Sequence, residues 1–398
     1  MPVKRPRDRK QQILAAASEL FREHGYHNVS VADVSTKVEI TASALYRHYR
    51  NKNDMLYNAV LDGLGSLRDA VGGAADLSEL LSAMAARSAD RVDLPLLWQR
   101  EARYLDADQR RELQKQLGVV TARVAHLIAA DRPRLPERDR ELLALSLLAA
   151  FGSVAGLRVH LSRRRMEAVL RQIGERIAGC PLGHGADRPA PAEPTVSMPV
   201  SRREQLLTES IRLFDQRGYQ SVLTEDIGEA CGTTGPNVYN HFDAKIDILV
   251  AAVTRGFDRR GVGARLALSR ATDPADGLRK LLAAHIEFAL EDGHLIGLMA
   301  TELDALPANI RKVVAQQQRD HLDQWVRILA SVRPELERAE ARITVNAVLT
   351  LVANAARTRA LRARVDLGDR LDEIGLAALL GTDDPAGVRA GAAATDAR

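Results

Sequence analysis

The sequence is poor in residues that build cross-linked or metal-bound folds. Its 398 residues include two cysteines, Cys180 and Cys231. Two distant thiols form neither a disulfide framework nor the paired spacing of a zinc site, and so few cysteines suit a reducing compartment. Aromatic residues make up 4% of the chain, which leaves too few to surround a cationic ligand with an aromatic cage.

Long hydrophobic segments and catalytic motifs are also missing. The longest apolar stretch, Leu142 to Leu157, is too short to span a bilayer. The basic N-terminus lacks the hydrophobic stretch of a secretory signal. The sequence has no nucleophile motif and no phosphate-binding glycine loop, and its histidines and acids lack metal-ligand spacing. We therefore expect a cytoplasmic protein that is not an enzyme, interacts with no membrane and uses no metal or cofactor.

The remaining composition is typical of helices. Alanine, leucine and arginine dominate, long stretches lack proline, and no segment keeps the alternating pattern of a strand. The length suits two to four domains. The sequence therefore predicts an all-α fold.

One segment of the sequence occurs twice. The first copy contains Phe21, Gly25, Tyr26, Val29, Asp33, Thr41, Tyr46, His48, Lys52, Asp54 and Leu56. The second has the same residue types at Phe214, Gly218, Tyr219, Val222, Asp226, Thr234, Tyr239, His241, Lys245, Asp247 and Leu249, always 193 residues later. Roughly a third of positions 9–64 are identical to positions 202–257 without a gap.

The duplication continues beyond these segments at a different spacing. Glu101 matches Glu302 and Arg110 matches Arg311, both 201 residues apart, and the same spacing persists to Ile173. The second copy therefore contains an insertion of eight residues between positions 257 and 299. This regularity indicates that a whole multi-domain unit is repeated in tandem.

Composition shifts divide the chain into six segments. We expect an arm and DNA-binding domain 1 at 1–62, a helical effector and dimerisation domain at 63–178 and a Pro/Gly-rich linker at 179–200. The second unit follows as DNA-binding domain 2 at 201–256 and a second helical domain at 257–381, and the tail at 382–398 has a disordered composition.

The repeated segment has the local signals of three short helices. Residues 9–24 show an apolar face of helical period, and Gly25 suits the left-handed conformation that ends a helix. Ser30 is a good N-cap for a helix over 31–38, and Thr41 for one over 42–49. We expect Leu45 and Tyr49 to anchor that third helix in the core.

The outward face of the third helix suits DNA. Small residues on its first turn let a helix approach base edges, and its N-terminus favours a phosphate. Hydroxyl, imidazole and ammonium groups nearby can donate to phosphates, and Arg47 can reach a base or a phosphate. The preceding arm (Lys4, Arg5, Arg7, Arg9 and Lys10) adds positive charge that we expect to be unstructured. The predicted contacts of the first head are Ser30, Thr41, Ala42, Ser43, Ala44, Tyr46, Arg47, His48 and Lys52. Those of the second are Thr234, Gly235, Pro236, Asn237, Tyr239, Asn240, His241 and Lys245.

These features resemble the DNA-binding domain of the tetracycline-repressor (TetR) family. The similar segments are SVADVSTKVEITASALYRHYRNKNDML and LTEDIGEACGTTGPNVYNHFDAKIDIL. The resemblance implies two tandem helix-turn-helix units with helical effector domains, a four-helix dimer interface, and a small effector that shifts the spacing of the heads and releases DNA. Two features depart from the family pattern: Glu39 stands where a glycine is usual, and Pro236 lies in the second recognition helix.

The two heads differ in charge. Residues 1–52 contain ten cationic and five acidic residues, a balance of +5, whereas residues 200–245 contain five and seven, a balance of −2. Because phosphate contacts supply a large part of DNA affinity, we expect the first head to contribute more. The second head then either reads bases through Asn237 and Asn240 or is partly degenerate.

Two apolar segments at equivalent positions, 142–160 and 343–361, are candidates for the family's dimerisation helices, with 166–178 and 369–380 as partners. We expect an intramolecular pseudo-dimer, with a two-chain homodimer as the alternative. An unknown small molecule is the expected effector. Its candidate contacts are Trp98, Arg103, Tyr104, His126, His285, Phe288, Met299, Glu302 and Trp325. An architectural DNA-binding protein without a ligand, or an activator, is the alternative to a ligand-responsive repressor of a double-stranded operator.

Overall fold

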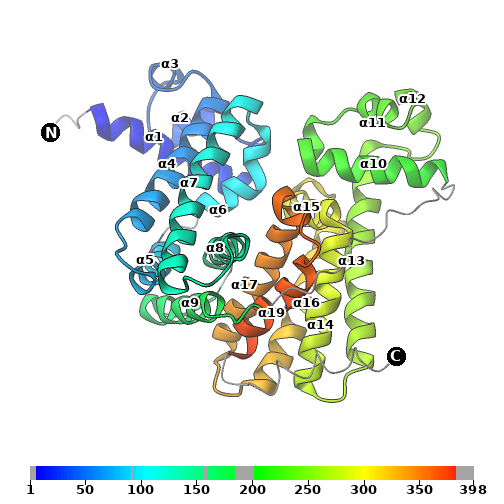
Figure 1. The fold of residues 1–398 in the computed structure, drawn as a ribbon. Helices are drawn as coiled ribbons and strands as arrows, with labels where there is room; N and C mark the ends of the chain where they lie inside the picture. The colour runs from blue at the N-terminus through cyan, green and yellow to red at the C-terminus, as the bar shows by residue number, and fades with distance from the viewer. Residues whose placement is uncertain (1–5, 91–92, 156, 158, 184–200, 382–398) are drawn as a thin grey trace.

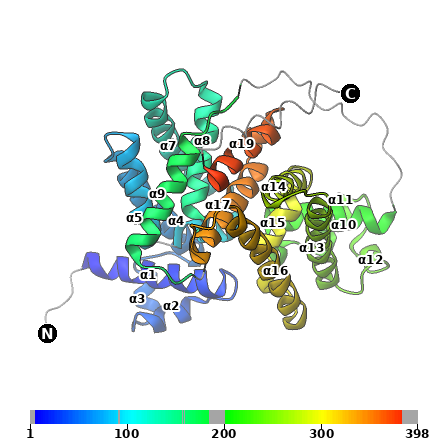
Figure 2. The same cartoon turned by 90° about the horizontal axis from the view of Figure 1, so that it is seen from below.

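The computed structural model describes residues 6–90, 93–155, 157, 159–183 and 201–381. Every regular element within these ranges is helical, which confirms the all-α prediction. The tail at 382–398 and most of the linker at 179–200 lie outside the described residues. Figures 1 and 2 show two helical halves side by side, each with a small head at the upper end in Figure 1.

The two halves have matching element orders. The first contains α1 (Pro6–His24), α2 (Val31–Lys37), α3 (Ala42–Tyr46), α4 (Lys52–Gly72), α5 (Leu77–Asp90), α6 (Asp93–Leu96), η1 (Leu97–Glu101), η2 (Ala102–Tyr104), α7 (Ala107–Asp131), α8 (Glu137–Gly152) and α9 (Arg163–Ala178). The second contains α10 (Arg202–Arg217), η3 (Tyr219–Ser221), α11 (Thr224–Ala230), α12 (Gly235–Val238), α13 (Lys245–Ser269), α14 (Pro274–Glu291), α15 (Gly293–Thr301), η4 (Leu303–Ala305), α16 (Ala308–Val332), α17 (Arg338–Arg357), α18 (Arg359–Arg362) and α19 (Leu367–Leu380).

The eight inserted residues lengthen one helical hairpin. Helix α13 has 25 residues against 21 in α4, and α14 has 18 against 14 in α5. Each helix of the second hairpin is thus longer by four residues, about one turn. Because both helices grow by a turn, their faces keep their orientation toward the bundle.

The halves meet along α8, α9, α17 and α19, the four segments expected to form the interface. The apolar stripe of α8 is buried, including Leu143, Leu147 and Phe151. Two boundaries differ from expectation. Helix α8 ends at Gly152 because the Ser153 hydroxyl bonds back to the Ala150 carbonyl, while the Ser153 carbonyl accepts from Asn346 in α17.

The second boundary lies in α17, which ends at Arg357 instead of continuing to position 361. Thr358 leaves the helical conformation, with φ −82° and ψ 109°, and its hydroxyl donates to the Asn354 carbonyl. The short helix α18 follows as a separate element. The chain therefore turns at Thr358, between α17 and α18.

Two buried acids form ion pairs across the interface. Asp139 in α8 pairs with Arg364 of the second half at 2.6 Å, and Glu340 in α17 pairs with Arg165 of the first. Asp139 and Glu340 occupy equivalent positions, 201 residues apart. Arg364 corresponds to Arg163, two positions before Arg165, so the two pairs are related only approximately. Equivalent acids that each pair across the interface still approach the pattern of a two-fold dimer interface.

Candidate functional site

The local signals of the first head are confirmed. Gly25 ends α1 with φ +78°, and Ser30 caps α2 through the Asp33 amide at 3.1 Å. Thr41 caps α3 through the Ala44 amide at 3.2 Å. These contacts satisfy backbone donors that a helix start otherwise leaves without partners.

The third helix of the head is shorter than expected. Helix α3 ends at Tyr46, and the residues that follow form a turn. Leu45 and Tyr49 are buried as expected, and the Tyr49 hydroxyl donates to the Lys10 carbonyl at 3.1 Å. Burial raises the pKa of Tyr49 to about 12. Most of the other predicted contacts are exposed on the outward face, namely Thr41, Ala42, Ser43, Tyr46 and Arg47, whereas Ala44 and His48 are half-buried.

The arm is only partly outside the fold. Helix α1 begins at Pro6, so Arg7, Arg9 and Lys10 belong to a helix and not to an unstructured segment. The Arg9 guanidinium donates to the Val38 carbonyl at 3.4 Å, which turns it toward α2. Lys4 and Arg5 lie outside the described residues.

The second head exposes a different set of side chains. Thr234, Pro236, Asn237, Tyr239, Asn240 and His241 are exposed. The Asn237 amide donates to the Thr233 hydroxyl at 3.0 Å. Gly235 is buried instead: a Cβ there would lie 3.1 Å from the Glu225 carboxylate, so this residue packs α12 on α11 and cannot read DNA.

The caps of the second helix distinguish the heads further. In the first head the Ser30 hydroxyl is held by Asp33 at 2.7 Å, and these hydrogen bonds lower the pKa of Asp33. The equivalent position in the second head is Leu223, whose side chain is 60% exposed. The first head therefore presents a hydroxyl where the second presents an apolar side chain.

Lys52 and Lys245 hold the junction between head and bundle. The Lys52 ammonium donates to the Tyr26 carbonyl at 2.8 Å and lies 4.1 Å from the centre of the Tyr26 ring. Lys245 repeats both contacts on Tyr219, at 2.9 Å and 4.3 Å. Burial lowers the pKa of both lysines. This placement favours a structural role over the phosphate contact expected from the sequence.

The duplicated glutamates hold the same junction from the other side. A Glu101 oxygen accepts from the Tyr26 amide at 3.2 Å, and Glu302 accepts from the Tyr219 amide at 3.1 Å. Both carboxylates are buried, which raises their pKa values. The residue after each helix-ending glycine is thus clamped by a lysine at its carbonyl and a glutamate at its amide. The sequence did not predict this hinge contact, and the exact duplication of the two glutamates was the available signal.

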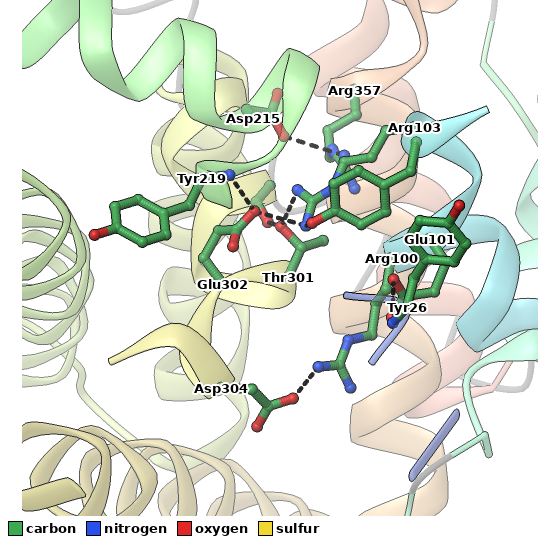
Figure 3. A network of polar contacts seen from close by, with 12 residues as sticks. Tyr26, Arg100, Glu101, Arg103, Asp215, Tyr219, Thr301, Glu302, Asp304 and Arg357 are labelled. Carbon is green, nitrogen blue, oxygen red and sulfur yellow. Dashed lines mark hydrogen bonds and ion pairs between the residues drawn. The ribbon is translucent and has the colours of Figure 1, made fainter. Parts of the chain in front are cut away.

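The two junctions are also joined to each other, as Figure 3 shows. Arg103 pairs with Glu302 at 2.6 Å and donates to the Thr301 hydroxyl at 2.8 Å, while Arg100 pairs with Asp304. Positions 100 and 103 correspond to 301 and 304 at the spacing of 201 residues. The contact is therefore reciprocal.

Tyr104 completes this junction. Its ring stacks on Tyr26 with centroids 5.6 Å apart, and it lies against Gly218, where a Cβ would meet the ring. Burial raises the pKa of Tyr104 to about 12. Tyr104 therefore lies between the hinges of both heads and not in the ligand cavity predicted for it.

A cavity of about 1310 Å³ opens in the first half and reaches the second. Its lining includes apolar residues of α4, α7 and α8 together with Trp98 and Arg103, as predicted. The far wall belongs to the second half, where Asp215 pairs with Arg357 at 3.1 Å and bonds His294 at 2.9 Å. His126 is exposed on α7 and lies outside this lining.

The second-half candidates lie apart from this cavity. His285 and Phe288 line a separate cavity of about 210 Å³. Met299 packs against Gly256, and Trp325 is buried with its ring nitrogen donating to His321 at 3.2 Å. Glu302 serves the junction. Met299, Glu302 and Trp325 are therefore wrong as cavity residues, because packing and the hinge contact occupy their side chains.

Among the residues that the structure describes, none of the helices has both the length and the apolar composition needed to span a membrane. The same residues contain no group of three or more histidines, cysteines or acids placed to hold a metal ion.

Comparison with known proteins agrees with the geometry. Residues 13–59 and 206–252 each match the family described as "Bacterial regulatory proteins, tetR family". The chain is 31% identical over 157 residues to the HTH-type transcriptional repressor KstR2 of Mycolicibacterium smegmatis, covering 37% of this chain and 75% of the repressor. It is 33% identical over 91 residues to the transcriptional activator FasR of the same species, covering 23% of this chain and 42% of that protein.

A solved structure is also similar over about half of the chain. A TetR-family transcriptional regulator from Bordetella parapertussis 12822 matches with a TM-score of 0.43 and 21% identity, covering 45% of this chain and 95% of that one. The matched relatives are transcriptional regulators, and the DNA-binding domain of their family occurs twice in this chain. The chain belongs to the TetR family of helix-turn-helix transcription regulators, as a tandem duplication of the family's unit.

Proposed function

We propose that this protein is a ligand-responsive repressor that binds its operator as a single-chain pseudo-dimer. The ion pairs of the equivalent acids, Asp139 with Arg364 and Glu340 with Arg165, support this, because they join the halves as an interface between two subunits would. The relatives include both a repressor and an activator. Direct blocking of a promoter needs no further contact surface, so we favour repression.

The DNA-binding surface consists of the exposed faces of both heads. In the first head it is built around Thr41, Ala42, Ser43, Tyr46 and Arg47. The first head supplies most of the phosphate attraction because its charge balance is +5 against −2 in the second. The heads read half-sites about 34–36 Å apart, one helical turn. These half-sites differ in sequence because the heads differ.

The observation that carries ligand control is the position of Arg103. Its side chain lines the large cavity and pairs with Glu302, which accepts the Tyr219 amide at the hinge of the second head. A ligand that draws Arg103 into the cavity therefore weakens the support of that hinge. Because Tyr104 lies between both hinges, movement of this segment also reaches the first head.

The cavity lining suggests an amphipathic anion as the effector. Leu64, Leu113 and Phe151 provide an apolar wall, and Arg359 and Arg362 approach from the second half. Neither of these arginines forms an ion pair with any described residue, so both are available to a carboxylate or phosphate.

Two measurements test this function. Operator selection from a random DNA pool with the full chain should yield one asymmetric sequence, and light scattering should give a single chain of 43.5 kDa. Binding without sequence preference would support the architectural alternative, and a stable two-chain particle would refute the monomeric pseudo-dimer.

Coupling is tested with Glu302→Gln, because Glu302 is outside the cavity lining. Operator affinity is measured with and without amphipathic carboxylates. We expect the variant to bind the ligand as the wild type does but to lose ligand-dependent release. Arg111→Met, which changes an exposed arginine, is the control and should respond normally. Normal release by the Glu302 variant would contradict the proposed route.

A further inference from the structure

The bundle of the second half contains a group of nitrogen-bearing side chains that the proposed function does not use. Arg260 in α13, His285 in α14 and His321 in α16 line a cavity of about 210 Å³. This cavity shares no lining residue with the larger one. The two spaces are therefore separate.

Arg260 is a cation without an acidic partner. Among the described residues it forms no ion pair, and its guanidinium lies 4.7 Å from the centre of the Phe257 ring. Burial lowers the pKa of Arg260 to about 10. Placing a charge in such surroundings without a counter-ion is costly, so an anion that filled the site would stabilise it.

The two histidines offer hydrogen-bond donors to the same space. His285 is 7% exposed, and neither of its ring nitrogens makes a hydrogen bond among the described residues. Burial, followed by the Arg260 charge, lowers its pKa to about 4. His321 accepts from the Trp325 ring nitrogen through Nε2, which places its own hydrogen on Nδ1.

The remaining lining limits the size and shape of the occupant. Leu281, Ala284 and Phe288 supply an apolar wall. The acids Glu287 and Glu291 are exposed at the rim, and Glu291 is neutralised by Arg259. An engineered apolar cavity of about 150 Å³ holds benzene, so this one is large enough for a compact ring or a short chain.

The first half supplies an internal comparison. At the spacings of 193 and 201 residues, Arg260 corresponds to Leu67, His285 to Met84 and His321 to Val120. These positions are apolar in the first half, and Met84 and Val120 are buried in its core. The fold therefore needs no polar side chains there.

We propose that the second half holds its own ligand site, in which Arg260, His285 and His321 bind the carboxylate of a small monoanion whose apolar tail packs against Phe288. The carboxylate accepts from the guanidinium and from one ring N–H of each neutral histidine. The site is much smaller than the large cavity, so the protein binds two anions of different size.

Calorimetric titration of the full-length protein with benzoate and butyrate tests this site without DNA. We expect saturable binding of benzoate at one site per chain, at least tenfold tighter than binding of benzamide. Equal binding of benzamide, or no binding of either carboxylate up to about 10 mM, would overturn the proposal. Binding of inorganic phosphate as tight as that of benzoate would overturn the apolar part of the site.

Variants that copy the first half locate the site. Arg260→Leu and His285→Met should each weaken benzoate binding at least tenfold, while Arg265→Met, an exposed arginine on the same helix, leaves it unchanged. Melting temperatures without ligand serve as the folding check, and Arg260→Lys retains the charge if the leucine variant is unstable. Unchanged benzoate affinity in folded Arg260 variants would place the binding elsewhere.

Discussion

Replacing Glu39 by glycine should stabilise the first head. Glu39 has φ +54° and is the non-glycine residue with positive φ in the described part of the chain. Its amide donates to the Thr36 carbonyl at 3.2 Å, and the next amide, of Ile40, reaches Ser35 at 3.0 Å. This pair of bonds closes α2 with the motif that requires a left-handed residue.

The second head gives the reference state. Gly232 occupies the equivalent position with φ +65°, and its amide bonds Glu229 at 2.9 Å. A left-handed conformation costs a non-glycine residue about 1–2 kcal/mol. Glycine gains about 0.4–1 kcal/mol of additional entropy in the unfolded chain, which opposes the benefit. We therefore expect Glu39→Gly to raise the free energy of unfolding of the first head by about 0.5–1 kcal/mol.

Hydrogen exchange in increasing urea, read by mass spectrometry, measures each head separately. Peptides from residues 13–59 should become more protected in Glu39→Gly, while those from 206–252 remain unchanged. Glu39→Ala removes the charge but keeps the Cβ, so it should give little gain. Equal stabilisation by alanine and glycine would refute the backbone argument, as would a neutral effect of Gly232→Ala, whose Cβ would meet no atom within 4 Å.

Three further predictions follow from the junction and the interface. Lys52→Met should cost about 1–2 kcal/mol of stability, because it leaves the Tyr26 carbonyl without its donor, and thermal unfolding measures this loss. The same variant should keep the salt dependence of operator binding, whereas Arg47→Met should reduce it, and salt titrations of operator affinity distinguish the two. Arg103→Met should destabilise the protein by about 3 kcal/mol at neutral pH, because it leaves the buried Glu302 carboxylate without its partner. Burial raises the pKa of Glu302, so this loss grows as the pH rises above the pKa of the carboxyl in the unfolded chain and is smaller at acidic pH. Urea melts across pH should show this trend. Asp139→Asn should weaken the pairing of the halves after cleavage at a protease site placed in the linker, and unchanged co-elution of the fragments on size exclusion would argue against the ion pair.

Contacts within a few residues were predictable from the sequence. The caps at Ser30 and Thr41 and the left-handed Gly25 depend on side chains and dihedral preferences of their own turn. The burial of Leu45 and Tyr49 followed from helical spacing. Such rules need no knowledge of the rest of the fold.

Contacts between distant segments were not predictable in this way. The Lys52 ammonium was expected at DNA because its own sequence surroundings do not show the Tyr26 carbonyl, 26 residues away. Tyr104 was expected in a ligand cavity, and the contact of Arg103 with Glu302 was not foreseen, because the position of the second half decides what these side chains meet. The spacing of the repeat contained part of this information. Position 304 is the equivalent of position 103, and residues 100 and 304 become neighbours when the two halves are related by a two-fold axis.

The duplication explains why the two halves are alike at the hinges and different at the ligand and DNA surfaces. In a homodimer every substitution occurs twice, so a charge added to one cavity or head is added to its equivalent as well. A tandem chain removes this constraint: Leu67 and Arg260, or Arg47 and Asn240, differ while the lysine and glutamate clamps remain the same. Tyr104 and Arg103 join the two clamps to each other. The same covalent connection would let the proposed asymmetric operator and the proposed second ligand site arise in one half while the hinges stay alike.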